Sequence, residues 1–239
     1  MKKMILFDLD GTLLPQDQDE FIKVYFGELV KKLAYMGLPA STPDEQKLLA
    51  GAVWAGTKAM MMNDGSKTNE ERFFETFEAV TGYSLFSRKS EFDAFYENEF
   101  QNVGKVCGQN PLVKQTIDDL KSRGYRVAIA TNPLFPLIAN RQRVKWAGLD
   151  IDGFEFCTCY ENSSYCKPRL EYYQAILEHL GVSAEECIMV GNDVREDMVA
   201  RKLGMDVFLI TDCLINVDNE DIEQFPHGDW NDFRRYMEI

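Results

Sequence analysis

The first fourteen residues, MKKMILFDLDGTLL, constrain the fold of this 239-residue chain more than any other segment. Met4–Phe7 is an apolar run of strand length, which is typical of a parallel strand buried on both faces. The run ends at Asp8-Leu9-Asp10-Gly11-Thr12. In open α/β sheets, ligands bind just beyond the carboxyl ends of the strands. The segment therefore predicts a first sheet strand with two aspartates at its functional edge.

Two aspartates that lie two residues apart offer one carboxylate that can attack and a second that can move protons. Gly11 follows at once and lets the backbone turn sharply beneath a bound group. The same residues also fit a strand that ends in an Asp-Gly turn, which is a common structure. Because a motif this short does not separate a reaction centre from a turn, the rest of the chain has to decide.

Residues 15–104 carry helical signals only. The segment at 18–36 places apolar side chains at helical spacing and ends at Gly37. Two Thr-x-x-Glu capping boxes, at 42–45 and 68–71, mark the starts of further helices. We predict helices here over residues 18–36, 43–62, 72–80 and 89–102.

From Asn110 onward, helix and strand signals alternate, as in a parallel sheet with crossover helices. The predicted strands cover residues 126–130, 154–159, 186–190 and 206–210. The predicted helices cover residues 111–123 and 137–147, a segment opened by Lys167-Pro168 that ends at 180, a segment that runs up to 203, and residues 230–236.

These patterns predict an α/β fold with a Rossmann-like, three-layer core whose sheet is parallel. Residues 1–14 and 105–239 form this core, and residues 15–104 form an inserted α-helical domain. The insertion follows the first strand directly, so it is placed to act as a lid over the two aspartates. We expect its hinges at residues 14–17 and 103–109, because glycines 104 and 108 permit large backbone changes.

Charge and hydropathy exclude several classes of partner. The net charge is −13, from 39 acidic and 26 basic residues, whereas nucleic-acid binding needs a positive face. No apolar stretch approaches the ~20 residues of a membrane span, and the N-terminus lacks a signal pattern. We therefore expect no nucleic-acid partner and no membrane partner, a cytoplasmic location, and a monomer or homodimer.

The cysteines do not predict a metal site. The chain has six, without paired Cys-x-x-Cys spacing. Cys157, Cys159 and Cys166 lie close together in the sequence, but a fourth zinc ligand at suitable spacing is missing. Reduced thiols are the simpler expectation for such a chain. The two histidines, His179 and His227, are too few to build a proton relay.

Polar residues also follow other predicted elements. Thr131 ends the strand VAIAT and Asn132 follows it; the Thr131 hydroxyl and the following amides can donate to a phosphoryl oxygen, although a simple turn is an alternative. Lys167 stands before Pro168 at a helix start, where it opposes the helix dipole but favours anions. Asp193 and Asp197 follow the strand IMVGN, and hard Mg²⁺ accepts such carboxylates together with substrate phosphate.

The order DLDGT, then Thr-Asn after a strand, then Lys-Pro, then GNDVRED resembles the four motifs of the haloacid dehalogenase (HAD) superfamily. The resemblance covers residues 1–14 and about 105–211. The helical insertion matches the place and type of that superfamily's C1 cap. The resemblance thus implies a hydrolase of the phosphatase branch that acts on a small phosphorylated metabolite and requires Mg²⁺.

The resemblance also implies a role for each motif residue. Asp8 would be the nucleophile that forms an aspartyl-phosphate, and Asp10 would act as acid and then as base. Thr131 and Asn132 would hold phosphoryl oxygens, and Lys167 would offset negative charge. The remaining roles concern the metal: Asp8, the Asp10 carbonyl and Asp193 would hold Mg²⁺, with Asp197 just behind them.

One feature departs from the superfamily pattern, because Asn192 intervenes between Gly191 and Asp193. Counted from Gly191, Asn192 takes the usual aspartate position, whereas counted back from Asp197, Asp193 does. We favour Asp193, because a carboxylate binds Mg²⁺ better than an amide does.

Other activities of the superfamily stay open. A haloacid dehalogenase does not need Asp10 and Asp193, and a phosphonatase would need a cap lysine such as Lys58 or Lys67. A phosphomutase would have to retain a bisphosphate intermediate, and a non-catalytic binding protein would not need the complete set of motif residues. The substrate is not encoded in any motif.

Overall fold

The computed structural model describes residues 3–239, and its sheet confirms the predicted α/β fold. Five parallel strands lie in the order β2-β1-β3-β4-β5. Their bounds are Met4–Phe7 (β1), Arg126–Ile129 (β2), Cys187–Gly191 (β3), Asp206–Ile210 (β4) and His227–Gly228 (β5). Phe7 at the end of β1 is level with Ile129 of β2 and with Val190 of β3. The residues that follow these three strands are therefore brought to one edge of the sheet.

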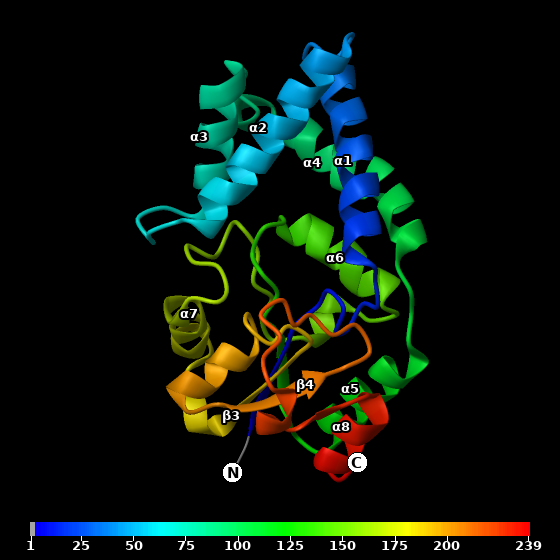
Figure 1. The fold of residues 1–239 in the computed structure, drawn as a ribbon, viewed down its shortest axis with the longest axis vertical. Helices are drawn as coiled ribbons and strands as arrows, with labels where there is room; N and C mark the ends of the chain where they lie inside the picture. Colours follow the sequence, from blue (N-terminus) through cyan, green and yellow to red (C-terminus); the bar gives the residue numbers. More distant parts are fainter. Residues whose placement is uncertain (1–2) are drawn as a thin grey trace.

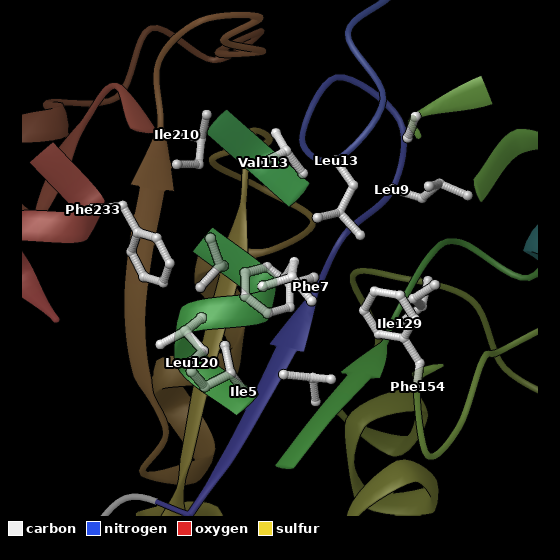
Figure 2. Close-up of a cluster of buried hydrophobic side chains, with 14 of the residues drawn as sticks. Ile5, Phe7, Leu9, Leu13, Val113, Leu120, Ile129, Phe154, Ile210 and Phe233 are labelled. Carbon is white, nitrogen blue, oxygen red and sulfur yellow. The ribbon is translucent and has the colours of Figure 1, made fainter. Parts of the chain in front are cut away.

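Alternation along each strand explains the three layers. Ile5 and Phe7 belong to the apolar cluster on one face of the sheet, whereas Met4 and Leu6 belong to the cluster on the other. Figure 2 shows the first cluster, with Phe7 and Ile5 of β1 beside Leu120. Successive strand side chains point to opposite faces, so a strand covered on both sides is apolar throughout.

Helices on the two faces supply the outer layers. Helices α5 (Pro111–Ser122) and α8 (Trp230–Tyr236) contribute to the first cluster, and α7 (Leu170–Leu180) contributes to the second. The start of α5 is fixed by the Asn110 side chain, which accepts a hydrogen bond from the Leu112 amide at 3.0 Å.

Helices α1 (Gln18–Tyr35), α2 (Pro43–Met61), α3 (Asn69–Thr81) and α4 (Lys89–Glu97) come between β1 and β2. Together with the 3₁₀ helices η1 (Phe86–Arg88) and η2 (Glu99–Val106), we call them the helical insert. Figure 1 shows α1–α4 at the end of the molecule opposite the C-terminus, and α6 (Leu137–Trp146) between them and the sheet. Both predicted capping boxes form, at Thr42 and at Thr68. The insert has an apolar cluster of its own, rich in phenylalanine.

The predicted strand at 154–159 is wrong. This segment runs beside β2, and the Ile129 amide donates to the Phe156 carbonyl at 2.8 Å, but only one isolated bridge forms, between Ile129 and Cys157. The amides of Glu155 and Thr158 also donate to β2, but the carbonyls of residues 158 and 157 accept from the amide side chains of Asn140 and Asn162 at 2.9 and 3.0 Å. Pairing with β2 therefore stays limited to a single bridge.

Three helix predictions also differ from the structure. The helix at 89–102 is interrupted at Asn98, whose side chain donates to the Ala94 carbonyl at 2.7 Å. Helix α7 begins at Leu170, so Lys167 precedes the helix. The helix predicted up to residue 203 is only the 3₁₀ helix η5 (Met198–Leu203). No helix within residues 3–239 is long and apolar enough to span a membrane.

Candidate active site

Asp8 is held rigidly at the carboxyl end of β1. Its amide donates to the Val190 carbonyl of β3 at 2.8 Å, and the residue is 7% exposed. Thr131 follows β2 and is buried, and Asp193 follows β3. These three residues therefore converge because their strands are neighbours in the sheet.

Lys167 forms a buried ion-pair network with two aspartates. Its Nζ lies 2.8 Å from Asp8 Oδ1 and 2.6 Å from Asp197 Oδ1. Burial lowers the pKa of Lys167, but the Asp197 and Asp8 carboxylates outweigh burial and raise it well above its usual value. Lys167 is therefore a fixed positive charge beside the Asp8 carboxylate.

Thr12 and Asn192 hold the other side of Asp8. The Thr12 hydroxyl lies 3.2 Å from Asp8 Oδ2 and 3.0 Å from Asn192 Oδ1, and Asn192 Nδ2 donates to the Cys213 carbonyl at 2.6 Å. Gly11 makes this approach possible, because a Cβ at its φ of +76° would lie 2.3 Å from Asn192 Nδ2. Both polar ends of the Asn192 side chain are thus already engaged.

Asp10 contacts Arg143, a residue that the sequence did not single out. Arg143 lies on α6, is fully buried, and forms an ion pair with Asp10 Oδ2. Its Nη1 donates to Asn140 at 2.8 Å, and its guanidinium lies 4.6 Å from the centroid of the Phe135 ring. Within residues 3–239, the buried Asp10 Oδ1 has no hydrogen-bond partner. The sequence offers only a weak signal for this contact. Two polar residues, Asn140 and Arg143, stand among the apolar residues on the buried face of α6.

Thr131 and Asn132 lie where phosphate binding was predicted. The Thr131 carbonyl accepts hydrogen bonds from Thr158 Oγ1 at 2.6 Å and from Tyr172 Oη at 2.8 Å, which fixes the loop. Asn132 Nδ2 donates to Glu196 at 3.0 Å. Burial raises the pKa of Glu196 to about 7, against the opposing effect of Lys167.

The oxygen donors at this edge fit a hard divalent cation. Asp193 Oδ1 accepts hydrogen bonds from two amides at 2.8 Å, and burial raises the pKa of this carboxyl. A cation beside it would favour the charged form and relieve the cost of burial. Residues 3–239 contain no group of three His, Cys, Asp or Glu side chains arranged for a metal. The predicted set of Mg²⁺ ligands differs from such a group, because it consists of two carboxylates, those of Asp8 and Asp193, and one backbone carbonyl, that of Asp10.

One cavity of about 710 Å³ joins these residues to the helical insert. Asp8, Asp10, Thr131, Asn132, Asp193 and Asp197 line it from the core. Lys167 lies behind Asp8, with which it pairs. The structure therefore gathers all the predicted site residues at one place, and the contacts of Thr12, Asn192 and Arg143 add to what the motifs indicated.

Sequence comparison assigns the chain to a family. The model of the haloacid dehalogenase-like hydrolases matches residues 2–204, so the chain belongs to this family of enzymes. Among curated relatives, it is 26% identical to a glyceraldehyde 3-phosphate phosphatase from Methanothermobacter thermautotrophicus, over 94% of this chain and 92% of that protein. It is also 26% identical to a phosphoglycolate phosphatase from Aquifex aeolicus, over 84% and 80% of the two chains.

Solved structures share the fold. A HAD phosphatase from Thermococcus onnurineus has a TM-score of 0.62 at 21% identity, covering 99% of this chain and 98% of its own. A 2-haloacid dehalogenase from Pseudomonas syringae has a TM-score of 0.64 at 20% identity, covering 99% and 97%. Because a phosphatase and a dehalogenase match equally well, the fold alone does not choose the reaction.

Proposed function

We propose that the protein is a Mg²⁺-dependent phosphatase that hydrolyses a small phosphorylated metabolite through an aspartyl-phosphate on Asp8. The observation that carries the proposal is the Asp8 carboxylate, which is fixed at the end of β1, paired with Lys167 at 2.8 Å and open to the cavity. The phosphatase names of curated relatives along most of the chain support the same reaction class.

In the first step, an Asp8 oxygen attacks phosphorus, the bond from phosphorus to the leaving oxygen breaks, and Asp10 protonates that oxygen. In the second step, Asp10 takes a proton from water, whose oxygen attacks phosphorus and releases Asp8. Lys167, Thr131 and Asn132 stabilise the negative charge on the phosphoryl oxygens.

Asp8, the Asp10 carbonyl and Asp193 would hold Mg²⁺, which supplies further neutralisation of the phosphoryl charge. Asp193 suits this role better than Asn192, because Asn192 is engaged with Thr12 and with the Cys213 carbonyl.

Residues 15–104 would act as a C1-type cap over this site. Cavity-lining residues such as Phe21 and Trp54 come from this segment, and it stands between two parallel-sheet strands. The protein would be cytoplasmic and a monomer or homodimer, with no nucleic-acid partner.

The alternative reactions have less support. Within residues 3–239, neither Lys58 nor Lys67 lines the cavity, and Lys67 pairs with Glu75 at 2.5 Å, which disfavours a Schiff-base phosphonatase. A dehalogenase has no need of the Asp10 and Asp193 groups that face the cavity.

Single-turnover hydrolysis in ¹⁸O-water tests the proposal. Water attacks phosphorus in the second step, so label is expected in the released phosphate and not in Asp8. Label in Asp8 would mean that water attacked the carboxyl carbon, which is the dehalogenase outcome. The nearly isosteric Asp8→Asn variant is expected to fold and to lose turnover.

A further inference from the structure

One part of the cavity lining is a continuous row of aromatic rings. Trp54 contacts Phe26, Phe26 contacts Tyr25, and Tyr25 contacts Phe135, with ring centroids 6.4, 5.6 and 5.1 Å apart. Phe21 continues the row at 6.1 Å from Phe135. All five rings line the cavity, and four of them come from helices α1 and α2 of the insert. Such a wall offers a broad apolar surface to whatever is attached to the phosphoryl group.

The mouth of the same cavity is also apolar. Ile22, Trp54, Met61 and Leu214 line it and are 37%, 54%, 42% and 37% exposed. A large apolar side chain gains free energy when it leaves water, at about 25 cal/mol per Å² of buried surface. A cluster of exposed apolar residues around a cavity is typical of a ligand-binding site.

The cavity offers no cation to a second negative group. Among residues 3–239, the charged side chains that line it are all aspartate or glutamate. The two buried cations next to it are engaged, since Lys167 pairs with Asp8 and Asp197, and Arg143 pairs with Asp10. A carboxylate or second phosphate on the leaving group would therefore meet like charge without compensation.

One polar atom within the apolar wall lacks a partner. The hydroxyl of Tyr160 is buried and makes no hydrogen bond within the described part of the chain, and its ring lines the cavity. Burial raises the pKa of Tyr160, so the group stays a neutral hydroxyl.

We propose that the substrate of this site is a phosphate ester of an alcohol that carries no second negative group and has an apolar or aromatic body that packs on the Trp54–Phe26–Tyr25 row. This inference rests on the proposed phosphatase function and adds to it the class of leaving group. The cavity has a volume of about 710 Å³, which lies within the usual range for small-molecule sites. It therefore has room for both the phosphoryl group and an apolar leaving group.

Three phosphate esters of matched chain length test the proposal, with kcat/KM measured in Mg²⁺: those of 3-phenylpropan-1-ol, 1-propanol and 3-hydroxypropanoate. The phenylpropyl ester is expected to exceed the propyl ester by at least tenfold, and the propyl ester to exceed the carboxylated ester by a similar factor. A carboxylated ester that is hydrolysed as well as the propyl ester, or a phenylpropyl ester that gains nothing, would overturn the proposal.

Two variants with a matched control assign the preference to the cavity wall. Trp54→Ala is expected to lower kcat/KM about tenfold more for the phenylpropyl ester than for the propyl ester. Thr57→Lys, at another lining position of α2, is expected to raise hydrolysis of the carboxylated ester. The control, Leu48, lies on the same helix, is 52% exposed and is outside the cavity lining, so neither Leu48→Ala nor Leu48→Lys should change the order. If Leu48→Ala reproduced the effect of Trp54→Ala, the assignment to the wall would be wrong.

Failure of the inference and failure of the proposed function give different results. Hydrolysis of 4-nitrophenyl phosphate with no preference for the uncharged esters would overturn only the leaving-group class. No hydrolysis of any of these four esters in Mg²⁺ would overturn the phosphatase function and the inference with it.

Discussion

Replacing Arg143 by methionine is expected to impair proton transfer by Asp10 far more than it lowers stability. Arg143 is the only polar contact of the Asp10 side chain that the structure shows within residues 3–239; it holds Oδ2, the other carboxylate oxygen is buried without a partner, and Asp10 lines the cavity. Without this contact, Asp10 would lose its fixed position over the leaving oxygen. We expect kcat to fall at least 100-fold with the alkyl esters, about 2.7 kcal/mol in the barrier.

The effect on stability is the balance of opposing contributions. Losing the partner of a buried carboxylate costs about 3–5 kcal/mol, but the Asp10 side chain is 35% exposed and can be solvated from the cavity, so about 2 kcal/mol is a better figure. Losing the contact of the guanidinium with the Phe135 ring costs about 1 kcal/mol more. Against this, burial lowers the pKa of Arg143 to about 10, well below its ordinary value, and methionine removes this cost of about 3 kcal/mol. The net change in the free energy of unfolding should therefore stay within about 2 kcal/mol.

Leaving-group dependence is the decisive assay. A nitrophenolate leaves without a proton, whereas an alkoxide needs one from Asp10. Arg143→Met should therefore lose much more activity with propyl phosphate than with 4-nitrophenyl phosphate, and urea unfolding measures its stability. Arg141→Met is the control, because Arg141 lies on the same helix, is half exposed and pairs with Asp152. An equal loss with both esters would refute the positioning role of Arg143.

Two further predictions concern the metal and the attachment of the insert. Mg²⁺ is expected to raise the melting temperature through binding to the folded state, and Asp193→Ala should abolish this increase without unfolding the protein; an unchanged increase would contradict the ligand assignment. Asn69 is fully buried, and its Nδ2 donates to the Pro133 carbonyl at 3.1 Å, so Asn69→Ala should lower the free energy of unfolding by about 1–3 kcal/mol in urea titration. A change below about 0.5 kcal/mol would show that water replaces this contact.

The four longer strands could be predicted to within a residue or so, because each is buried on both faces and appears in the sequence as an apolar run. Strand β5 has only two residues and could not be seen in this way. The segment at 154–159 also bonds to β2, through the amides of Glu155, Ile129 and Thr158, yet the carbonyls of residues 157 and 158 accept from the side chains of Asn162 and Asn140. Sequence periodicity reports burial, and it does not report which partner satisfies the backbone.

The same distinction applies to the site. The convergence of Asp8, Thr131 and Asp193 could be predicted, because each lies within two residues of a strand end and the strands are neighbours in the sheet. Arg143 reaches Asp10 from a helix 133 residues away, and no local pattern marks such a contact. Counting residues along the fourth motif does not decide between Asn192 and Asp193 as the metal ligand. The hydrogen bonds of Asn192 to Thr12 and to the Cys213 carbonyl appear only in the three-dimensional structure.

The start of α3 shows that the helical insert has a second attachment besides its two linkers. The amides of Asn69 and Glu70 donate to the carbonyls of Ser163 and Tyr160 at 2.8 and 2.9 Å, and Arg169 donates to the Asn63 carbonyl at 2.7 Å. At about 1 kcal/mol for each bond, breaking these three contacts and the Asn69 side-chain bond costs about 4 kcal/mol, which keeps a fully detached insert below about 1% of molecules. Motion at residues 14–17 and 103–109 would therefore pivot about the start of α3. Helix α1, which carries Phe21 and Tyr25, would then move most over Asp8, whereas Tyr160 would stay with the core.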